Sequence, residues 1–185
     1  MKFLSPCLLL LIVSAPPAPA AEPKPVVDVS QLGADLLALP SPGDQVSVAP
    51  SPEGGLAVNI APGPLNYPGI TFNFAQDTLI LDDCGYIELR VTNTSAAILS
   101  LNLRVDSIPS GDIPRGRSTG TAYLKPGESG RARAYFAHPP RGYEPVSPNH
   151  IKQILIYTNK SADTARSFRI EALEAAGEPG QTKEN

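Results

Sequence analysis

The chain has 185 residues, and its 15 Lys and Arg against 18 Asp and Glu give a formal net charge of −3 at pH 7. This acidic balance argues against nucleic acid and anionic membranes as partners, because both bind basic surfaces. The 21 prolines and 15 glycines disfavour long helices, so the composition predicts short strands and turns.

The N-terminus has the three parts of a secretory signal peptide. Lys2 supplies a positive charge, an apolar run follows at 8–13, and small residues lead to Ala18-Pro19-Ala20. The apolar run is too short to cross a bilayer. We therefore expect residues 1–20 to be a cleaved signal peptide, with the protein secreted or periplasmic and without a membrane span.

The rest of the chain predicts one domain. Residues 25–176 are expected to form it, after an exposed leader at 21–24 and before a disordered tail at 177–185. The domain holds a single cysteine, Cys84, so it must rely on its hydrophobic core and not on a disulfide. Its first segment, 26–39, fits either a strand or one helical turn.

The strongest pattern lies at 85–107, where two segments alternate almost strictly between apolar and polar side chains. Arg90 is on the polar side of the first segment, and Asn102 and Arg104 are on the polar side of the second. Short polar and small residues at 93–97 suit a turn. We expect the two segments to form a β-hairpin with one apolar and one charged face.

Further strands are predicted before and after this pair. Residues 107–117 are expected to form an open polar loop, and Pro126-Gly127 gives residues 125–128 the order of a type II turn. The other expected strands are 45–49, 56–60, 70–74, 119–124, 131–136, 151–157 and 167–173. Eight or nine short strands at this spacing predict an all-β fold, an antiparallel β-sandwich.

The polar face of these strands is the main candidate for a binding site. Guanidinium groups, amides and aromatic rings are what a protein offers to a sugar. If their strands are neighbours, six carbohydrate-binding side chains project together: Arg90, Asn102, Arg104, Arg131, Arg133 and Tyr135. The other interpretation is a solvated face on which arginines pair with Glu88 and Asp106. The four arginines would also suit an anionic glycan.

Tyrosines offer a second kind of contact to a sugar. Four of them could serve as stacking platforms, one from a loop: Tyr67, Tyr86, Tyr143 and Tyr157. The other interpretation is that each is a half-buried packing residue.

The order of four segments resembles a known family. The segments are YPGITF, LDDCGYIELRVTNTSAAILSLNLRVDS, STGTAYLKPGESGRARAYF and SPNHIKQILIYTNKSADTARSFRIEAL. Over residues 25–176 this order is similar to the non-catalytic β-jelly-roll domain attached to β-agarases and related glycoside hydrolases, a galactose-binding-like carbohydrate-binding module. The resemblance implies a jelly-roll fold, a polysaccharide or glycan as partner, and an association with secreted glycoside hydrolases.

The resemblance also implies a structural calcium ion. Asp82 and Asp83, with Glu171 far along the chain, are the candidate metal ligands, because calcium prefers carboxylate oxygens. Asp77 and Glu174 are further candidates. The other interpretation is turn chemistry, since Asp favours turns. No other cofactor is expected.

Catalysis finds little support in the sequence, which has no H-E-x-x-H motif and no Gly-rich phosphate loop. We expect a secreted, non-catalytic carbohydrate-binding module. Two alternatives stay open. One is a structural or adhesive envelope protein on the same fold without a working sugar site, and the other, less favoured, is a small glycoside hydrolase with two facing carboxylates.

Overall fold

The computed structural model describes residues 22–29, 38–40, 43–75, 79–107, 116–160 and 164–183. Within these ranges the regular structure is eleven strands, which pair antiparallel. The predicted all-β class is confirmed. Among the described residues no helix has the length and apolar character needed to span a bilayer. The predicted signal peptide at 1–20 and Asp77 lie outside these ranges.

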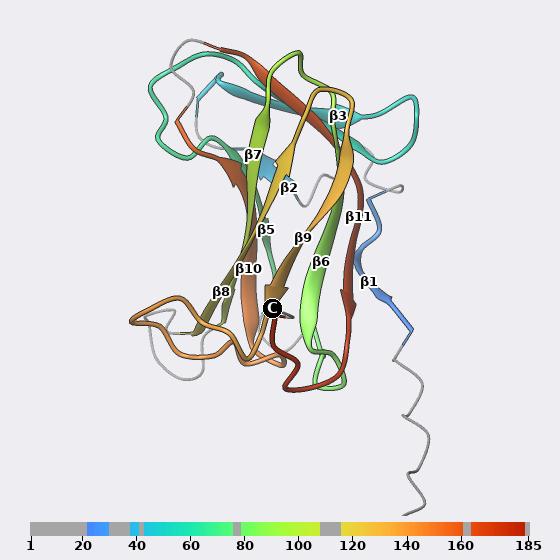
Figure 1. Ribbon diagram of the computed structural model, residues 1–185, viewed down its shortest axis with the longest axis vertical. Helices are drawn as coiled ribbons and strands as arrows, with labels where there is room; N and C mark the ends of the chain where they lie inside the picture. Colours follow the sequence, from blue (N-terminus) through green and yellow to red (C-terminus); the bar gives the residue numbers. More distant parts are fainter. Residues whose placement is uncertain are drawn as a thin grey trace, which may run out of the picture.

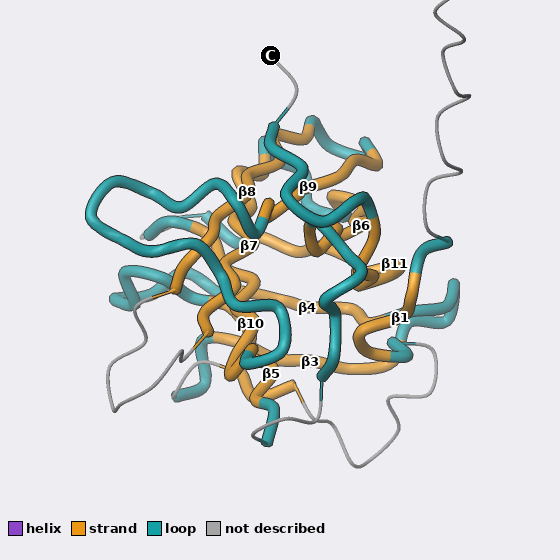
Figure 2. The backbone as a smooth tube through the Cα atoms, turned by 90° about the horizontal axis from the view of Figure 1, so that it is seen from below, coloured by secondary structure: helices purple, strands orange, loops and turns teal. Residues whose placement is uncertain are grey.

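The strands form two sheets that face each other, seen from the side in Figure 1 and from below in Figure 2. Sheet A has the order β3 (Val46–Pro50), β4 (Leu56–Ile60), β11 (Arg166–Ala176), β6 (Tyr86–Asn93) and β9 (Ser129–Tyr135), with β1 (Lys24–Val27) also on β11. Sheet B has the order β2 (Ala38–Pro40), β5 (Gly69–Asn73), β10 (Ile151–Thr158), β7 (Leu99–Ser107) and β8 (Gly116–Leu124). This is the predicted antiparallel sandwich.

The core lies between the sheets and is built from alternate residues of each strand. Ile87, Leu89 and Val91 of β6 are fully buried, and so are the leucines at 99, 101 and 103 of β7. Each such aliphatic side chain stabilises the fold by about 1.5–3 kcal/mol. The polar residues between them point outward, so each sheet keeps one polar face.

The predicted hairpin at 85–107 is wrong in its pairing. β6 pairs with β9 and β11 in sheet A, whereas β7 pairs with β8 and β10 in sheet B. Residues 94–98 therefore arch across the core from one sheet to the other. The alternation correctly indicates which side chains face inward. The apolar side chains of β6 and those of β7 pack into the same core, but they come from the two opposite sheets.

Asn93 holds this arch. Its side chain is fully buried, and its Nδ2 donates to the carbonyl oxygens of Ala97 at 2.9 Å and Leu124 at 3.0 Å. Its Oδ1 accepts from the backbone N–H of Ser95 at 2.9 Å and from the Ser95 hydroxyl at 2.7 Å. Because Leu124 belongs to sheet B, these bonds tie the end of β6 to the opposite sheet.

The turn predicted at 125–128 is confirmed and also joins the two sheets, since it links β8 to β9. The N–H of Glu128 donates to the carbonyl of Lys125 at 3.0 Å, and Gly127 has the positive φ, 74°, that a type II turn requires. β8 begins at Gly116, so the last part of the predicted loop at 107–117 is strand instead. The segment at 26–39 contributes β1 and β2 where it is described.

Local contacts are present at both ends of the predicted domain. Residues 177–183, predicted as part of a disordered tail, form a turn in which Glu178 accepts from the N–H of Gln181 at 3.0 Å. The side chain of Gln181 in turn accepts from the N–H of Glu178 at 3.2 Å. Lys24, predicted in the leader, belongs to β1 and forms an ion pair with Asp83.

Candidate functional site

The structure divides the six predicted carbohydrate-binding residues between two opposite surfaces. On β6 and β9 of sheet A lie Arg90, Arg131, Arg133 and Tyr135. On β7 of sheet B lie Asn102 and Arg104. The prediction that all six project together is therefore wrong, because β6 and β7 belong to different sheets.

On sheet A the arginines pair with carboxylates of neighbouring strands. Glu88, whose side chain is 9% exposed, accepts from Arg131 at 3.2 Å and from Arg133 at 2.6 Å. Arg90 donates to Glu174 at 3.0 Å. The hydrogen bond to Glu88 raises the pKa of the Arg133 guanidinium. This arrangement matches the solvated, ion-paired face that the sequence left open as an alternative.

Tyr135 is buried and not presented to solvent. Its ring lies 5.1 Å from that of Tyr86, and Arg133 lies 5.0 Å from the Tyr86 ring centroid. These contacts stabilise the outer surface of sheet A. A saccharide contact for the sheet A residues stays a prediction.

The outer face of sheet B carries a cleft of about 380 Å³, which we call the sheet B cleft. Residues from β5, β10, β7 and β8 and from the loop before β5 line it: Tyr67, Gly69, Ile70, Thr71, Arg104, Arg117, Leu155 and Tyr157. It combines aromatic rings, a hydroxyl and two guanidinium groups. Asn102 lies on the same sheet, opposite Tyr157 of β10 and Thr121 of β8.

An exposed tyrosine stands at one side of the sheet B cleft. Tyr67 is 68% exposed, and its ring meets that of Tyr157 edge to face, with centroids 5.6 Å apart and planes at 82°. Burial raises the pKa of Tyr157, although Arg104 and Arg117 act in the opposite direction. Tyr157 thus supports Tyr67, whose ring is open to solvent for a sugar to stack on.

A buried aspartate organises the basic side of the cleft. Gln153, Asp106 and Arg117 stand opposite one another on β10, β7 and β8. Asp106 is fully buried; its Oδ1 accepts from the Nε of Arg104 and of Arg117, each at 2.9 Å. Its Oδ2 accepts from Gln153 at 2.7 Å and lies 2.7 Å from Nη2 of Arg104. One carboxylate therefore fixes both guanidinium groups.

These contacts keep Asp106 ionised. Burial alone would raise its pKa, but hydrogen bonds from Arg104, Gln153 and Arg117 outweigh burial and lower the pKa below its ordinary value of 3.8. The carboxylate is negative at neutral pH, and its four acceptor positions are largely occupied by protein donors. We conclude that Asp106 is a positioning residue for the two arginines.

A second loop completes the basic side. Arg117 lies 4.0 Å from the ring centroid of Tyr143 and donates through Nη1 to the Tyr143 hydroxyl at 2.5 Å. The N–H of Arg117 also donates to the carbonyl of Glu144 at 3.1 Å. A Cβ on Gly116 would lie 2.8 Å from the carbonyl oxygen of Pro145, so glycine allows this loop to pack against the start of β8.

Sequence reasoning missed Arg117, which it placed in a loop. The sequence pattern could have placed it in the strand. Arg117 continues the alternation of Thr119, Thr121 and Tyr123, so all four side chains lie on the same side of the strand. Three of the four candidate tyrosines, Tyr67, Tyr143 and Tyr157, do lie at this face. The fourth, Tyr86, lies on sheet A.

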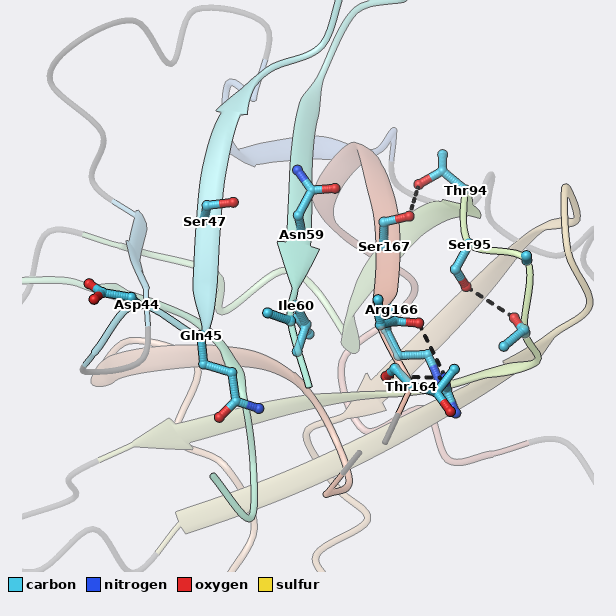
Figure 3. Close-up of a pocket in the computed structure, with 14 residues that line it drawn as sticks. Asp44, Gln45, Ser47, Asn59, Ile60, Thr94, Ser95, Thr164, Arg166 and Ser167 are labelled. Atoms are coloured by element: carbon cyan, nitrogen blue, oxygen red, sulfur yellow. Dashed lines mark hydrogen bonds between the residues drawn. The ribbon is translucent and has the colours of Figure 1, made fainter. Parts of the chain in front are cut away.

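A larger hollow, of about 660 Å³, lies near one end of sheet A (Figure 3). Figure 3 shows Ser47, Asn59 and Ser167 side by side on β3, β4 and β11, with Thr94 and Ser95 beyond them. The Thr94 hydroxyl donates to Ser167 at 2.9 Å. None of the described residues that line this hollow is aromatic, so it offers no ring for stacking and suits a sugar less well.

The three predicted calcium ligands are not brought together. Asp83 pairs with Lys24, which stands opposite Ala175 on β11. Glu171 is four residues away from Ala175 along the same strand, about 13 Å at 3.3 Å per residue. Asp82 is the exposed neighbour of Asp83. Among the described residues no three His, Cys, Asp or Glu side chains are grouped to hold a metal, so the predicted site made of these three is wrong.

One further spacing resembles a catalytic motif. Gly116–Gly120 has the order G-x-S-x-G, which in α/β hydrolases forms a sharp turn that exposes a nucleophilic serine. Here the segment runs within strand β8, and Ser118 is 1% exposed on its inner side. A buried strand serine cannot reach a substrate, so this spacing carries no hydrolase chemistry.

No family model and no curated protein matches the sequence. Solved structures do match in fold. The agarase AgWH50C is similar to this chain with a TM-score of 0.61 and 13% identity, over 85% of this chain. An exo-β-agarase is similar with a TM-score of 0.56 and 11% identity, over 82% of this chain. The chain spans 25% and 24% of these two structures, about a quarter of their length.

A family 11 carbohydrate-binding module is matched over nearly its full length. The module comes from Clostridium thermocellum, and the structure holds a β-1,3-1,4-mixed-linked tetrasaccharide. The TM-score is 0.60 at 11% identity, and the match covers 87% of this chain and 99% of the module. The chain therefore has the jelly-roll fold seen in carbohydrate-binding modules, as the resemblance implied.

Proposed function

We propose that the protein is an exported, non-catalytic module that binds a polysaccharide across the outer face of sheet B. The observation that carries this proposal is the sheet B cleft, where the exposed ring of Tyr67 stands beside the paired guanidinium groups of Arg104 and Arg117. The fold supports it, because solved carbohydrate-binding modules share this sandwich.

The chemistry of the cleft suits a sugar. A pyranose ring has apolar C–H faces that pack on an aromatic ring, and the 68% exposure of Tyr67 leaves its ring free for that contact. Sugar hydroxyls accept hydrogen bonds from guanidinium groups, and Thr71 adds a hydroxyl of its own to the lining. Because Asp106 holds both arginines in place, little side-chain entropy is lost when a ligand binds.

The residues that line the cleft suit binding without catalysis. A glycosidase places two carboxyl groups on either side of the scissile bond. Within the described part of the chain, the residues that line the sheet B cleft include no Asp or Glu, and Asp106 beneath them accepts hydrogen bonds from Arg104, Arg117 and Gln153. The described residues thus offer this cleft no pair for acid and base chemistry.

Export and partner enzymes belong to the same proposal. The sequence of residues 1–20 supports export. In the two agarases, the segment that matches this fold makes up about a quarter of the chain. This occurrence within agarases favours a role beside secreted glycoside hydrolases that act on the bound polysaccharide. N-terminal sequencing of protein recovered from culture medium or periplasm tests the export step, with Ala21 expected as the first residue.

Affinity electrophoresis tests the binding proposal. The purified protein is run through gels that contain agarose, mixed-linkage β-glucan, galactan or xylan, and at least one polysaccharide should retard it. Tyr67→Ala should weaken that retardation about threefold to tenfold, as expected for the loss of one aromatic contact. Tyr86→Ala, the same change on sheet A, is the matched control and should leave it unchanged.

The alternatives give different results. Retardation by none of a broad panel of polysaccharides, with binding to an envelope protein instead, favours a structural or adhesive role. New reducing ends that accumulate with time favour a glycoside hydrolase. Equal losses in the Tyr67→Ala and Tyr86→Ala variants would place the contact elsewhere than the sheet B cleft.

A further inference from the structure

We propose that the sheet B cleft selects a saccharide that carries an acidic group, a carboxylate or a sulfate, which lies against Arg104 and Arg117. This inference rests on the proposed function and names the class of sugar that the same site takes. It follows from the charge of the cleft, from the geometry of the two guanidinium groups and from the contrast with sheet A.

The charge of the cleft is opposite to that of the chain. The whole chain carries a net charge of −3, whereas the described residues that line the cleft include two arginines and no acid. Counting Asp106 beneath them, the two positive charges and one negative charge leave this site at +1. A local positive charge on an acidic protein attracts an anion to this place.

The geometry leaves donors for that anion. Each guanidinium has five N–H donors in a planar fork. The contacts above use two on Arg104, Nε and Nη2, and two on Arg117, Nε and Nη1. Oδ1 of Asp106 accepts a hydrogen bond from the Nε of both arginines, which holds the two guanidinium groups near each other. The oxygens of a carboxylate or a sulfate can accept two parallel hydrogen bonds from a guanidinium group.

Partial burial strengthens the preference for a charged ligand. The side chains of Arg104 and Arg117 are only 24% and 19% exposed, so solvent and salt screen them less than ordinary surface arginines. A neutral hydroxyl would accept the same hydrogen bonds, but a carboxylate or sulfate adds the Coulomb attraction between its own charge and the two guanidinium charges. The same cleft should therefore bind the acidic form of a sugar more tightly than the neutral form.

Sheet A differs in the exposure of its arginines and supplies the control. There Arg131 and Arg133 share Glu88, and Arg90 pairs with Glu174. The side chains of these arginines are more exposed than those of Arg104 and Arg117, so solvent and salt screen their charges more. Arg131 is 58% exposed, and its replacement removes one positive charge without touching the sheet B cleft. Arg131→Gln is thus matched in charge to Arg117→Gln.

Binding to matched polymer pairs tests the inference by biolayer interferometry. The pairs are agarose and sulfated galactan, methyl-esterified pectin and polygalacturonate, and hydroxyethyl- and carboxymethyl-cellulose. For at least one pair we expect the charged polymer to bind about tenfold more tightly, with a preference that falls as NaCl rises. Arg117→Gln should remove most of this preference, and Arg131→Gln should retain it.

Other outcomes overturn the inference at different levels. Equal or tighter binding of the neutral polymer in every pair contradicts the acidic sugar but leaves the proposed function standing. A charged preference that survives in both Arg117→Gln and Arg104→Gln contradicts the assignment to these arginines. No binding to any polymer of any pair contradicts the proposed function as well. The comparison of polymers uses the unaltered protein, so it stands even if a variant folds poorly.

Discussion

Asp106 and Arg117 stand directly opposite each other on β7 and β8, and the Nε of Arg117 donates to Oδ1 of Asp106 at 2.9 Å. The same oxygen accepts from Arg104, two residues along β7. The buried carboxylate of Asp106 thus both links strands β7 and β8 and holds the two arginines of the sheet B cleft in position. Loss of this carboxylate should affect stability and binding together.

Replacement of Asp106 by Asn should destabilise the protein by about 3–5 kcal/mol, because it leaves two partly buried arginines without their counter-charge. Urea unfolding followed by far-UV circular dichroism measures this, since the chain has no tryptophan to report by fluorescence. Asp82→Asn, at an exposed site, is the control and should change stability little. Equal stability of both variants would contradict the structural role of Asp106.

Stability should fall in acid through the same group. The pKa of Asp106 in the folded protein is lower than its ordinary value of 3.8, so its contribution is complete above that value and is lost as the pH falls through the folded pKa. The pKa of Asp83 is also lowered, chiefly by its hydrogen bond from Lys24. Unfolding curves between pH 2 and pH 6 should therefore show a shallower acid decline in Asp106→Asn than in the unaltered protein, whereas identical slopes would contradict this assignment.

The arch at 94–98 should depend on Asn93. Asn93→Ala removes four side-chain hydrogen bonds, to the carbonyls of Ala97 and Leu124 and from two groups of Ser95. Buried groups left without partners cost about 1–3 kcal/mol each, so we expect a loss of at least about 3 kcal/mol in urea unfolding. Asn59→Ala, on the exposed side of β4, is the matched control. A loss below about 1 kcal/mol for Asn93→Ala would show that the arch forms without this side chain.

Cys84 should be unreactive in the folded protein. Its side chain is 2% exposed, and burial together with the charge of Asp83 raises the pKa of the thiol, so little thiolate forms at neutral pH. Ellman's reagent should modify the folded protein that lacks residues 1–20 slowly at pH 8 and should react promptly once urea is added. Prompt reaction without urea would contradict the packed position of Cys84.

The sequence predicted the class of fold well because alternation is a local signal. The inward residues of β6 and β7, such as Leu89 and Leu103, could be named from their spacing alone. Alternation does not tell which strands are neighbours, since that choice depends on contacts distant in sequence. The arch at Asn93 depends on the carbonyl of Leu124, 31 residues away, and no local pattern indicates such a bond.

The candidate site was only partly predictable for the same reason. Arg104 and Asp106 were visible as polar residues of one strand, but the third member, Arg117, joins them from another strand. Arg90 and Arg131 have the same alternation as Arg104, yet they lie on the opposite sheet. Residue type and alternation identified the candidate binding residues. The order of the strands in the two sheets determines which of these residues lie close together.

An NMR titration tests the central claim most directly. Backbone amide shifts of the ¹⁵N-labelled protein are followed while an oligosaccharide of a bound polysaccharide is added. We predict that the largest shifts fall on β5, β7, β8 and β10, around Tyr67, Arg104, Arg117 and Tyr157. Shifts confined to β6 and β9, around Arg90 and Arg131, or to the hollow at Ser47 and Ser167, would show that the saccharide binds elsewhere.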